Sequence, residues 1–280
     1  TKRALRRGLN NPVEKQDWID ETRDAALRLL TDRDHDGPEI EALWANIGDE
    51  YFLRETPRDI SWHTEALLDR EDPDDPLVLI RESSQSVLAG GSQIFIYTPD
   101  TRNLFSATVN ALDSLGLTIM DARIITSVDG FSLDTYIVLD EHGTPIGEDW
   151  ARIEQIRKTL TETLKYPDRY ATTVSRRMPR RNKHFDVPTQ VVISNDIVND
   201  RTAVDIQTLD RPGLLAHIGR IFMRFEILVQ NARIATLGER AEDVFFITDL
   251  DGEPVSDPTL CQELQQTLKQ ELDDKNNGNT

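Results

Sequence analysis

The feature of this chain that most constrains its fold is an internal repeat. The segment "DARI" at 121–124 returns as "NARI" at 231–234, and the offset is 231 − 121 = 110 residues. The same offset aligns Asp100 with Asp210, Leu104 with Leu214, Leu112 with Phe222, Ala122 with Ala232, Ile124 with Ile234 and Thr126 with Thr236. Beyond one residue lost in a turn, "HGTPI" at 142–146 matches "DGEPV" at 251–255. Duplicated units accumulate such changes in their turns, so the sequence predicts one structural unit that occurs twice.

Each copy follows the order strand, helix, strand, strand, helix. In the second copy, residues 202–209 alternate apolar and polar side chains, as a strand with one buried face does. Residues 211–225 then place an apolar stripe along one helical face. The other elements of this copy are strands at 228–236 and 243–250 and a helix at 258–272. A β-rich run precedes the first strand of each copy, at 76–80 and 189–194, and we interpret it as a hairpin partner.

These elements predict an α+β fold made of tandem ferredoxin-like units, each a four-stranded antiparallel sheet with two helices on one face. The residues before the repeat have helical periodicity at 17–30 and 38–48, and a third helix is expected after "ETPRD". An acidic, proline-rich break at 69–76 separates them from the repeat. The predicted domains are a helical segment at 1–72, a first unit at 73–175, a basic linker at 176–188 and a second unit at 189–280.

Composition excludes several partners. The chain has 32 Lys and Arg against 50 Asp and Glu, a formal net charge of −18. This charge argues against a nucleic-acid or anionic membrane partner, because both repel an acidic surface. Cys261 is the single cysteine, which excludes a disulfide framework and suits a cytoplasmic protein. The basic segment "SRRMPRRNK" at 175–183 suits a solvated linker or a surface for an acidic partner, and both interpretations stay open.

The turn "LDRPGLL" at 209–215 carries the first functional signal. A βαββα unit whose first strand runs into this turn resembles an ACT domain, the small-molecule sensing module of amino-acid metabolism. In that family the turn and the N-terminus of the next helix form the ligand site. The residue types agree: Asp210 is expected to cap the helix, Pro212 suits its first turn, and Gly213 lets N–H groups face a ligand. Free N–H groups at a positive helix end can receive an amino-acid carboxylate.

The two copies differ at this turn. The first copy has "DTRNLF" at 100–105, so Asn103 stands where the second copy has Gly213. We expect the Asn103 side chain to crowd a pocket, so the first copy either holds a ligand itself or forms a wall of the second site. Asn231 suits a hydrogen bond to an amino acid or a place on a solvated strand face. The predicted ligand-binding residues are Asp210, Arg211, Pro212, Gly213, Leu214, Leu215, Asn231 and Arg233, with Asp100, Asn103, Leu104 and Asp121 from the first copy.

A second resemblance covers nearly the whole chain. It rests, in order, on "YFLRETPRDISWHTEALL" (51–68), "QIFIYTPD" (93–100), "DGFSLDTYIVLD" (129–140), "DRPGLLAHIGRIF" (210–222) and "ARIATLGERAEDVFFIT" (232–248). Together these segments resemble the C-terminal region of the bifunctional PII uridylyltransferase/uridylyl-removing enzymes. The resemblance implies that L-glutamine is the effector and that its binding favours removal of UMP from PII signalling protein over its addition. It also implies PII and the nucleotidyltransferase and HD domains of the same enzyme as partners.

Catalytic signals are missing from the sequence. We find no Gly-Ser motif with paired Asp and no His-Asp metal set, so we expect no catalytic centre and no cofactor here, with Mg²⁺ confined to the catalytic domains. "DRDHDG" at 32–37 resembles the start of a calcium-binding loop, but the twelfth position of that loop is Leu43 instead of Glu. An acidic loop without calcium is therefore expected there.

The main alternative function is a docking module without ligand. The sequence also leaves open whether the two copies pair within one chain or across a homodimer.

Overall fold

The computed structural model describes residues 12–70, 72, 75–83, 90–170, 188–196, 201–211, 213–237 and 239–276. The chain divides into two compact units, one comprising Thr1–Asp74 with Ile125–Phe131 and the other Asp75–Ile124 with Ser132–Thr280. We call them the helical unit and the sheet unit. The division at Asp74 lies two residues beyond the expected boundary at 72. Most of the basic linker expected at 176–188 lies outside the described residues.

The helical unit contains α2 (Pro12–Thr31), α3 (Gly37–Trp44), α4 (Asp49–Arg54) and α5 (Pro57–Leu68). A capping box begins α5, because Thr56 Oγ1 accepts from the Asp59 N–H at 3.2 Å and the Asp59 carboxylate accepts from the Thr56 N–H. The sequence pattern had placed one helix over 38–48, but α3 ends at Trp44 and Gly48 precedes α4. Trp44 is buried and donates from Nε1 to Thr64 Oγ1 at 2.9 Å, which ties α3 to α5.

The sheet unit holds both copies of the repeat. The first copy is β1 (Leu77–Glu82), β2 (Ser92–Pro99), α6 (Leu104–Ser114), β3 (Thr118–Ile125), β4 (Phe131–Leu139), α7 (Trp150–Lys165) and α8 (Pro167–Tyr170). The second copy is β5 (Gln190–Asp196), β6 (Arg201–Leu209), α9 (Leu214–Arg224), β7 (Leu228–Leu237), β8 (Arg240–Thr248) and α10 (Pro258–Asn276). The predicted hairpins are confirmed, because β1 pairs antiparallel with β2 and β5 pairs antiparallel with β6. Among the described residues of this unit, the short α8 has no counterpart in the predicted pattern.

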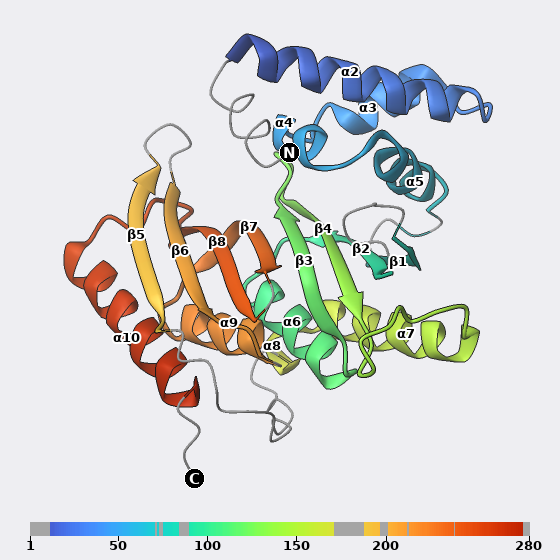
Figure 1. Cartoon of the computed structure of the whole chain (residues 1–280). Coiled ribbons are helices and arrows are strands. Elements are labelled where there is room, and N and C mark those ends of the chain that lie inside the picture. The colour runs from blue at the N-terminus through green and yellow to red at the C-terminus, as the bar shows by residue number, and fades with distance from the viewer. Residues whose placement is uncertain are drawn as a thin grey trace. The chain divides into compact units, whose positions relative to one another are not determined.

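The two copies form one continuous sheet. Its strand order is β1-β2-β4-β3-β7-β8-β6-β5, so β3 of the first copy is hydrogen-bonded to β7 of the second. The order reads the same from either end once each strand is replaced by its repeat equivalent, which indicates a pseudo-two-fold axis between β3 and β7. Figure 1 shows α6 and α9 close together on one face of this sheet. The copies therefore pair side by side within a single chain, which answers one question that the sequence left open.

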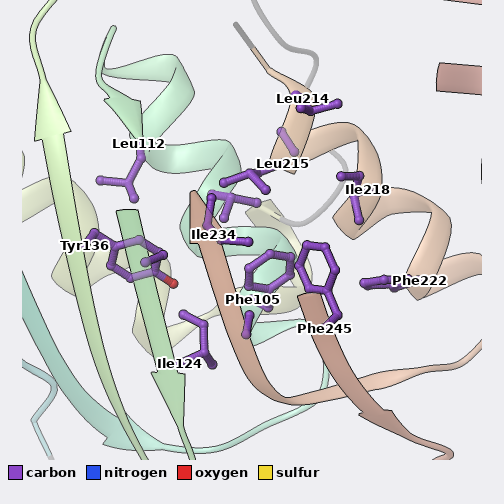
Figure 2. Packing of buried hydrophobic residues seen from close by; sticks show 14 of the residues in the cluster. Phe105, Leu112, Ile124, Tyr136, Leu214, Leu215, Ile218, Phe222, Ile234 and Phe245 are labelled. Atoms are coloured by element: carbon purple, nitrogen blue, oxygen red, sulfur yellow. The ribbon is translucent and has the colours of Figure 1, made fainter. Parts of the chain in front are cut away.

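A shared core explains why the copies belong to one compact unit. Phe245 of β8 makes edge-to-face contacts with Phe105 of α6 and Phe222 of α9, at ring-centroid distances of 5.8 and 5.1 Å. Figure 2 shows these rings together with Ile234 between the two copies. Helices α6 and α9 approach closely at Gly219, where an added Cβ would lie 3.1 Å from the Ser106 Cα. The units expected separately at 73–175 and 189–280 thus bury one another's apolar surface.

Further expectations from the sequence concern the calcium-like loop, membrane-spanning helices and the single cysteine. The calcium-like segment forms the loop between α2 and α3, and no group of metal-binding side chains is found among the described residues. In the same part of the chain, none of the helices combines the length and the apolar character that a membrane crossing requires. The Cys261 thiol is half-buried and donates to the Val255 carbonyl at 3.2 Å.

Candidate ligand site between the paired copies

The turn that precedes α9 is the centre of the candidate site. Gly213 occupies the N-cap position with φ 74° and ψ 11°, a left-handed conformation that glycine adopts without strain. Because glycine has no side chain, the N-cap residue contributes no cap to the first-turn N–H groups of α9. The sequence had assigned this cap to Asp210, and that assignment is wrong. The Asp210 carboxylate instead accepts hydrogen bonds from the Arg211 backbone and the Thr236 side chain. Pro212 lies outside the described residues.

The first copy builds the same turn with a different residue. Asn103 precedes α6 with φ 65° and ψ 5°, close to the values of Gly213. Its Nδ2 donates to Asp168 Oδ1 on α8 at 2.8 Å. The predicted crowding by Asn103 does not close the site, because a pocket remains beside this residue. The helix α8, which the pattern did not predict, supplies the acceptor that holds the asparagine amide.

Each turn opens onto a pocket whose other wall comes from the opposite copy. We call the pocket at the turn before α9 the second-turn pocket and the one at the turn before α6 the first-turn pocket. The second-turn pocket is lined by Asp210, Arg211, Gly213, Leu214, Leu215 and Ala216 of the second copy and by Val109, Asp113, Leu117, Thr118 and Ile119 of the first. The first-turn pocket is lined by Asp100, Thr101, Asn103, Leu104, Phe105, Ser106, Gly219, Phe222, Met223, Ile227, Leu228 and Val229. Their cavity volumes are about 40 and 30 Å³, and both pockets are partly open to solvent. At the 110-residue offset, nearly every residue that lines one pocket is equivalent to a residue that lines the other. The two pockets are therefore related by the pseudo-two-fold axis.

Arg211 connects the second turn to the last helix. Its guanidinium is largely buried and donates from Nη1 to the Leu272 carbonyl of α10 at 3.0 Å. Burial lowers the pKa of Arg211 to about 10, and the nearby carboxylates of Asp273 and Asp210 act in the opposite direction. Arg211 thus remains a cation whose hydrogen bond supports the C-terminal end of α10. This contact fixes the backbone position of the second turn.

The acidic side of the second-turn pocket has unusual electrostatics. Burial raises the pKa of Asp210 above its ordinary range, although hydrogen bonds from Arg211 and Thr236 oppose the shift. The neighbouring Asp243 on β8 is 1% exposed, and burial, reinforced by the Asp210 charge, raises its pKa to about 8. Asp243 Oδ1 accepts from the Ala235 N–H at 3.4 Å, whereas Oδ2 has no partner among the described residues. Burial therefore favours the protonated form of both carboxyl groups at this turn.

Asp113 reaches the second-turn pocket from the opposite copy, and the sequence analysis missed it. It lies in the last turn of α6 and is 8% exposed. Arg220 of α9 interacts with it electrostatically and donates from Nη1 to Asn110 Oδ1 at 3.3 Å. No local motif marks Asp113 as a pocket residue, because it lines the pocket only where the two copies pair. The signal in the sequence is a difference between the copies: the 110-residue offset aligns the acidic Asp113 with the apolar Met223.

Three predicted residues lie outside both pockets. Asn231 is on β7 opposite Phe246, on the face away from the core side chains of Ala232 and Ile234, as strand alternation predicts. It is only 1% exposed, so the solvated-face interpretation of Asn231 is wrong. Arg233 is exposed on the same strand. Asp121 accepts from Arg123 Nε at 3.2 Å. Of the residues predicted from the first copy, Asp100, Asn103 and Leu104 all line the first-turn pocket.

Two ferredoxin-like units that share one sheet, with a pocket at each first strand-to-helix turn, define an α+β protein of tandem ferredoxin-like units. The sequence comparisons narrow this class. Residues 14–66 match the family model described as the uridylyltransferase GlnD fifth domain. The bifunctional uridylyltransferase/uridylyl-removing enzyme of a Pseudomonas putida strain is 53% identical over 272 residues. The enzymes of Pseudomonas fluorescens strain SBW25 and Ectopseudomonas mendocina strain ymp are 52% identical over the same length.

Over nearly its whole length, the chain is similar to the C-terminal part of the bifunctional uridylyltransferase/uridylyl-removing enzymes. Each alignment covers 97% of this chain but 30% of the relative, so the chain spans less than a third of the length of these enzymes. Among solved structures, the crystal structure of aspartate kinase from Synechocystis overlaps with 65% of this chain and 27% of the kinase chain. Its TM-score is 0.36 and its sequence identity 18%, which is too weak to transfer any property.

Proposed function

We propose that this chain is the glutamine-sensing regulatory region of a bifunctional uridylyltransferase/uridylyl-removing enzyme that modifies PII signalling protein. L-Glutamine binds in the second-turn pocket and favours deuridylylation over uridylylation. One observation carries the proposal: the pocket lies at a helix end whose N-cap is a glycine, and both copies contribute its walls. The first-turn N–H groups of α9 receive the α-carboxylate, because the helix N-terminus carries partial positive charge.

The position of the pocket also supports a regulatory role. A ligand held between the two copies contacts both of them, so its affinity depends on how they pair. A ligand can shift a conformational equilibrium only if it binds the two states unequally. A site whose walls belong to different copies meets this requirement, because a change in the pairing of α6 and α9 changes the site. The side-by-side arrangement thus gives glutamine a physical route to the rest of the enzyme.

The remaining parts of the proposed activity belong to domains beyond this chain. The nucleotidyltransferase and HD domains of the same enzyme carry out the chemistry with Mg²⁺, in the cytoplasm, and respond to the sensor. The region needs no cofactor of its own. PII is the protein substrate, and homodimers form through these units if the paired sheet leaves a further surface for a second chain.

Isothermal titration calorimetry of the 280-residue chain with L-glutamine tests the proposal, with L-glutamate and 2-oxoglutarate as controls. Saturable heat with glutamine, and none with the two controls, is the expected result. Absence of binding to a chain with a cooperative melting transition would contradict the proposed site. The ligand-free docking module would then be the better account, and it predicts measurable association with PII or with the catalytic domains.

A further inference from the structure

The two pockets are equivalent in backbone but different in chemistry. The 110-residue offset carries Asp113 of the second-turn pocket onto Met223 of the first-turn pocket, and Thr118 onto Leu228. Both pairs come from the wall that the opposite copy supplies. The second-turn pocket therefore receives a carboxylate and a hydroxyl from its neighbour. The first-turn pocket receives two apolar side chains at the same places.

Asp113 is poorly explained by the stability of its own helix. An acidic residue in the last turn of a helix opposes the helix dipole, because that end carries partial negative charge. Burying a carboxylate also costs free energy unless a charge or hydrogen bonds compensate it. Arg220 is one structural partner of Asp113, and it also donates to Asn110 and lies near Glu271.

The surroundings favour a cationic group in the second-turn pocket. Asp113 and Asp210 both line it. Arg211 is the cation of the turn itself, but it donates to the Leu272 carbonyl on α10. An ammonium group that enters the pocket would compensate these carboxylates through charge-assisted hydrogen bonds.

We propose that Asp113 binds the α-ammonium group of the amino acid whose carboxylate lies at the N-terminus of α9. Asp113 is thus a specificity-determining residue contributed by the opposite copy. Met223 deprives the first-turn pocket of the same contact, so one chain binds one amino acid. This inference rests on the proposed function, since it concerns the ligand of the same site.

The test compares two ligands and two reciprocal variants by isothermal titration calorimetry. The ligands are L-glutamine and glutaramic acid, which is glutamine without its α-amino group. The wild-type chain is expected to bind one glutamine and no glutaramic acid. Asp113→Asn, which keeps the shape but removes the charge, is expected to weaken glutamine binding by about tenfold or more. Met223→Asp is expected to raise the stoichiometry from one glutamine per chain toward two.

A control variant separates ligand recognition from the structural role of Asp113. Arg220→Gln removes the cation that faces Asp113 but leaves the carboxylate in the pocket, so it is expected to retain glutamine binding. Equal losses in Arg220→Gln and Asp113→Asn would overturn the proposal, as would glutaramic acid binding as tightly as glutamine. Unchanged binding by Asp113→Asn would overturn it while leaving the proposed function intact. Wild-type protein that binds no glutamine would refute the proposed function, and the inference with it.

If Asp113→Asn fails to fold, as judged by its circular dichroism and melting curve, two measurements still decide the matter. Glutaramic acid probes the ammonium contact in the unaltered chain. Met223→Asp probes the same chemistry in the other pocket, where Asp113 plays no part. Binding of glutaramic acid to the wild type, or a stoichiometry that stays at one in Met223→Asp, would each contradict the assignment.

Discussion

The two copies of the repeat bury an aspartate at the same place on their fourth strand, β4 or β8, but the hydrogen-bond partners of the two aspartates differ. Asp134 of the first copy accepts from Ser132 Oγ at 2.5 Å and from the Tyr136 hydroxyl at 3.3 Å. Asp243 of the second copy is its equivalent at an offset of 109, and there Ala241 and Phe245 replace the two hydroxyl-bearing residues. Both copies thus have the carboxyl group and the same fold around it. The two hydroxyl donors are absent from the copy whose turn forms the proposed glutamine site.

Each copy should therefore respond differently when its aspartate becomes an asparagine. Asp243 has a folded-state pKa of about 8, well above the ordinary value of 3.8, because burial disfavours its charge. The folded state binds this proton more tightly than the unfolded state, so stability falls as pH rises from about 4 to about 8 and then levels off. Asp243→Asn removes this penalty and should stabilise the chain by roughly 1–3 kcal/mol at pH 8, with little gain near pH 4. Denaturant unfolding at several pH values measures the difference.

Asp134→Asn is the matched control for that experiment. It disturbs a buried carboxylate that already has two hydroxyl donors, so a loss of about 1–2 kcal/mol is expected. If both Asp243→Asn and Asp134→Asn stabilise the chain, or if neither does, the hydroxyl partners of Asp134 do not explain the difference between the two copies. A gain in Asp243→Asn that is the same at pH 4 and pH 8 would exclude proton binding as its cause.

The next largest effect is expected from a substitution at the contact between α6 and α9. At Gly219 a Cβ would meet the Ser106 backbone at 3.1 Å, and backbone cannot move aside as a flexible side chain can. Gly219→Val should therefore separate α6 from α9 and cost about 1–3 kcal/mol of stability through overpacking. Because both helices line both pockets, glutamine affinity should fall as well. Unchanged thermal unfolding and unchanged glutamine affinity would contradict the close packing.

The turns before α6 and α9 share a left-handed backbone conformation but have different residues there, Asn103 and Gly213. Gly213→Val puts a β-branched residue at φ 74° and should cost about 1–2 kcal/mol while obstructing the N–H groups of α9. Gly213→Asn should be tolerated better, because Asn103 already adopts φ 65° at the equivalent position. Melting temperatures and glutamine titrations of both variants check this order. Equal effects of valine and asparagine would mean that backbone strain does not control the turn.

The smallest expected effect concerns the first turn. Asp168→Ala removes the acceptor that holds the Asn103 amide, an exposed hydrogen bond worth about 0.5–1 kcal/mol. The freed side chain can then enter the first-turn pocket. Stability should drop slightly and glutamine binding at the second turn should stay unchanged. A large loss of glutamine affinity in Asp168→Ala would instead indicate that the first-turn pocket takes part in binding.

Sequence reasoning succeeded wherever the signal was periodic or repeated. The offset of 110 residues identified equivalent turns, and the structure gives Asn103 and Gly213 nearly identical backbone angles. Apolar alternation placed Ala232 and Ile234 in the core. Reasoning failed at Asp210, which was expected to cap α9 but is bound to Thr236. It also missed Asp113, because a wall contributed by a distant helix leaves no local pattern.

By itself, the sequence determined the secondary structure of the repeat, its duplication and the position of the two turns, since these depend on local periodicity and on residues such as Gly213. Tertiary structure alone decided that β3 pairs with β7 and that α6 packs against α9. The pairing of the copies is a long-range choice, set by which apolar surfaces are buried together and not by any short segment. That pairing brings Asp113 to the second turn and leaves Met223 at the first, so the chemical difference between the two pockets appears only in the folded chain.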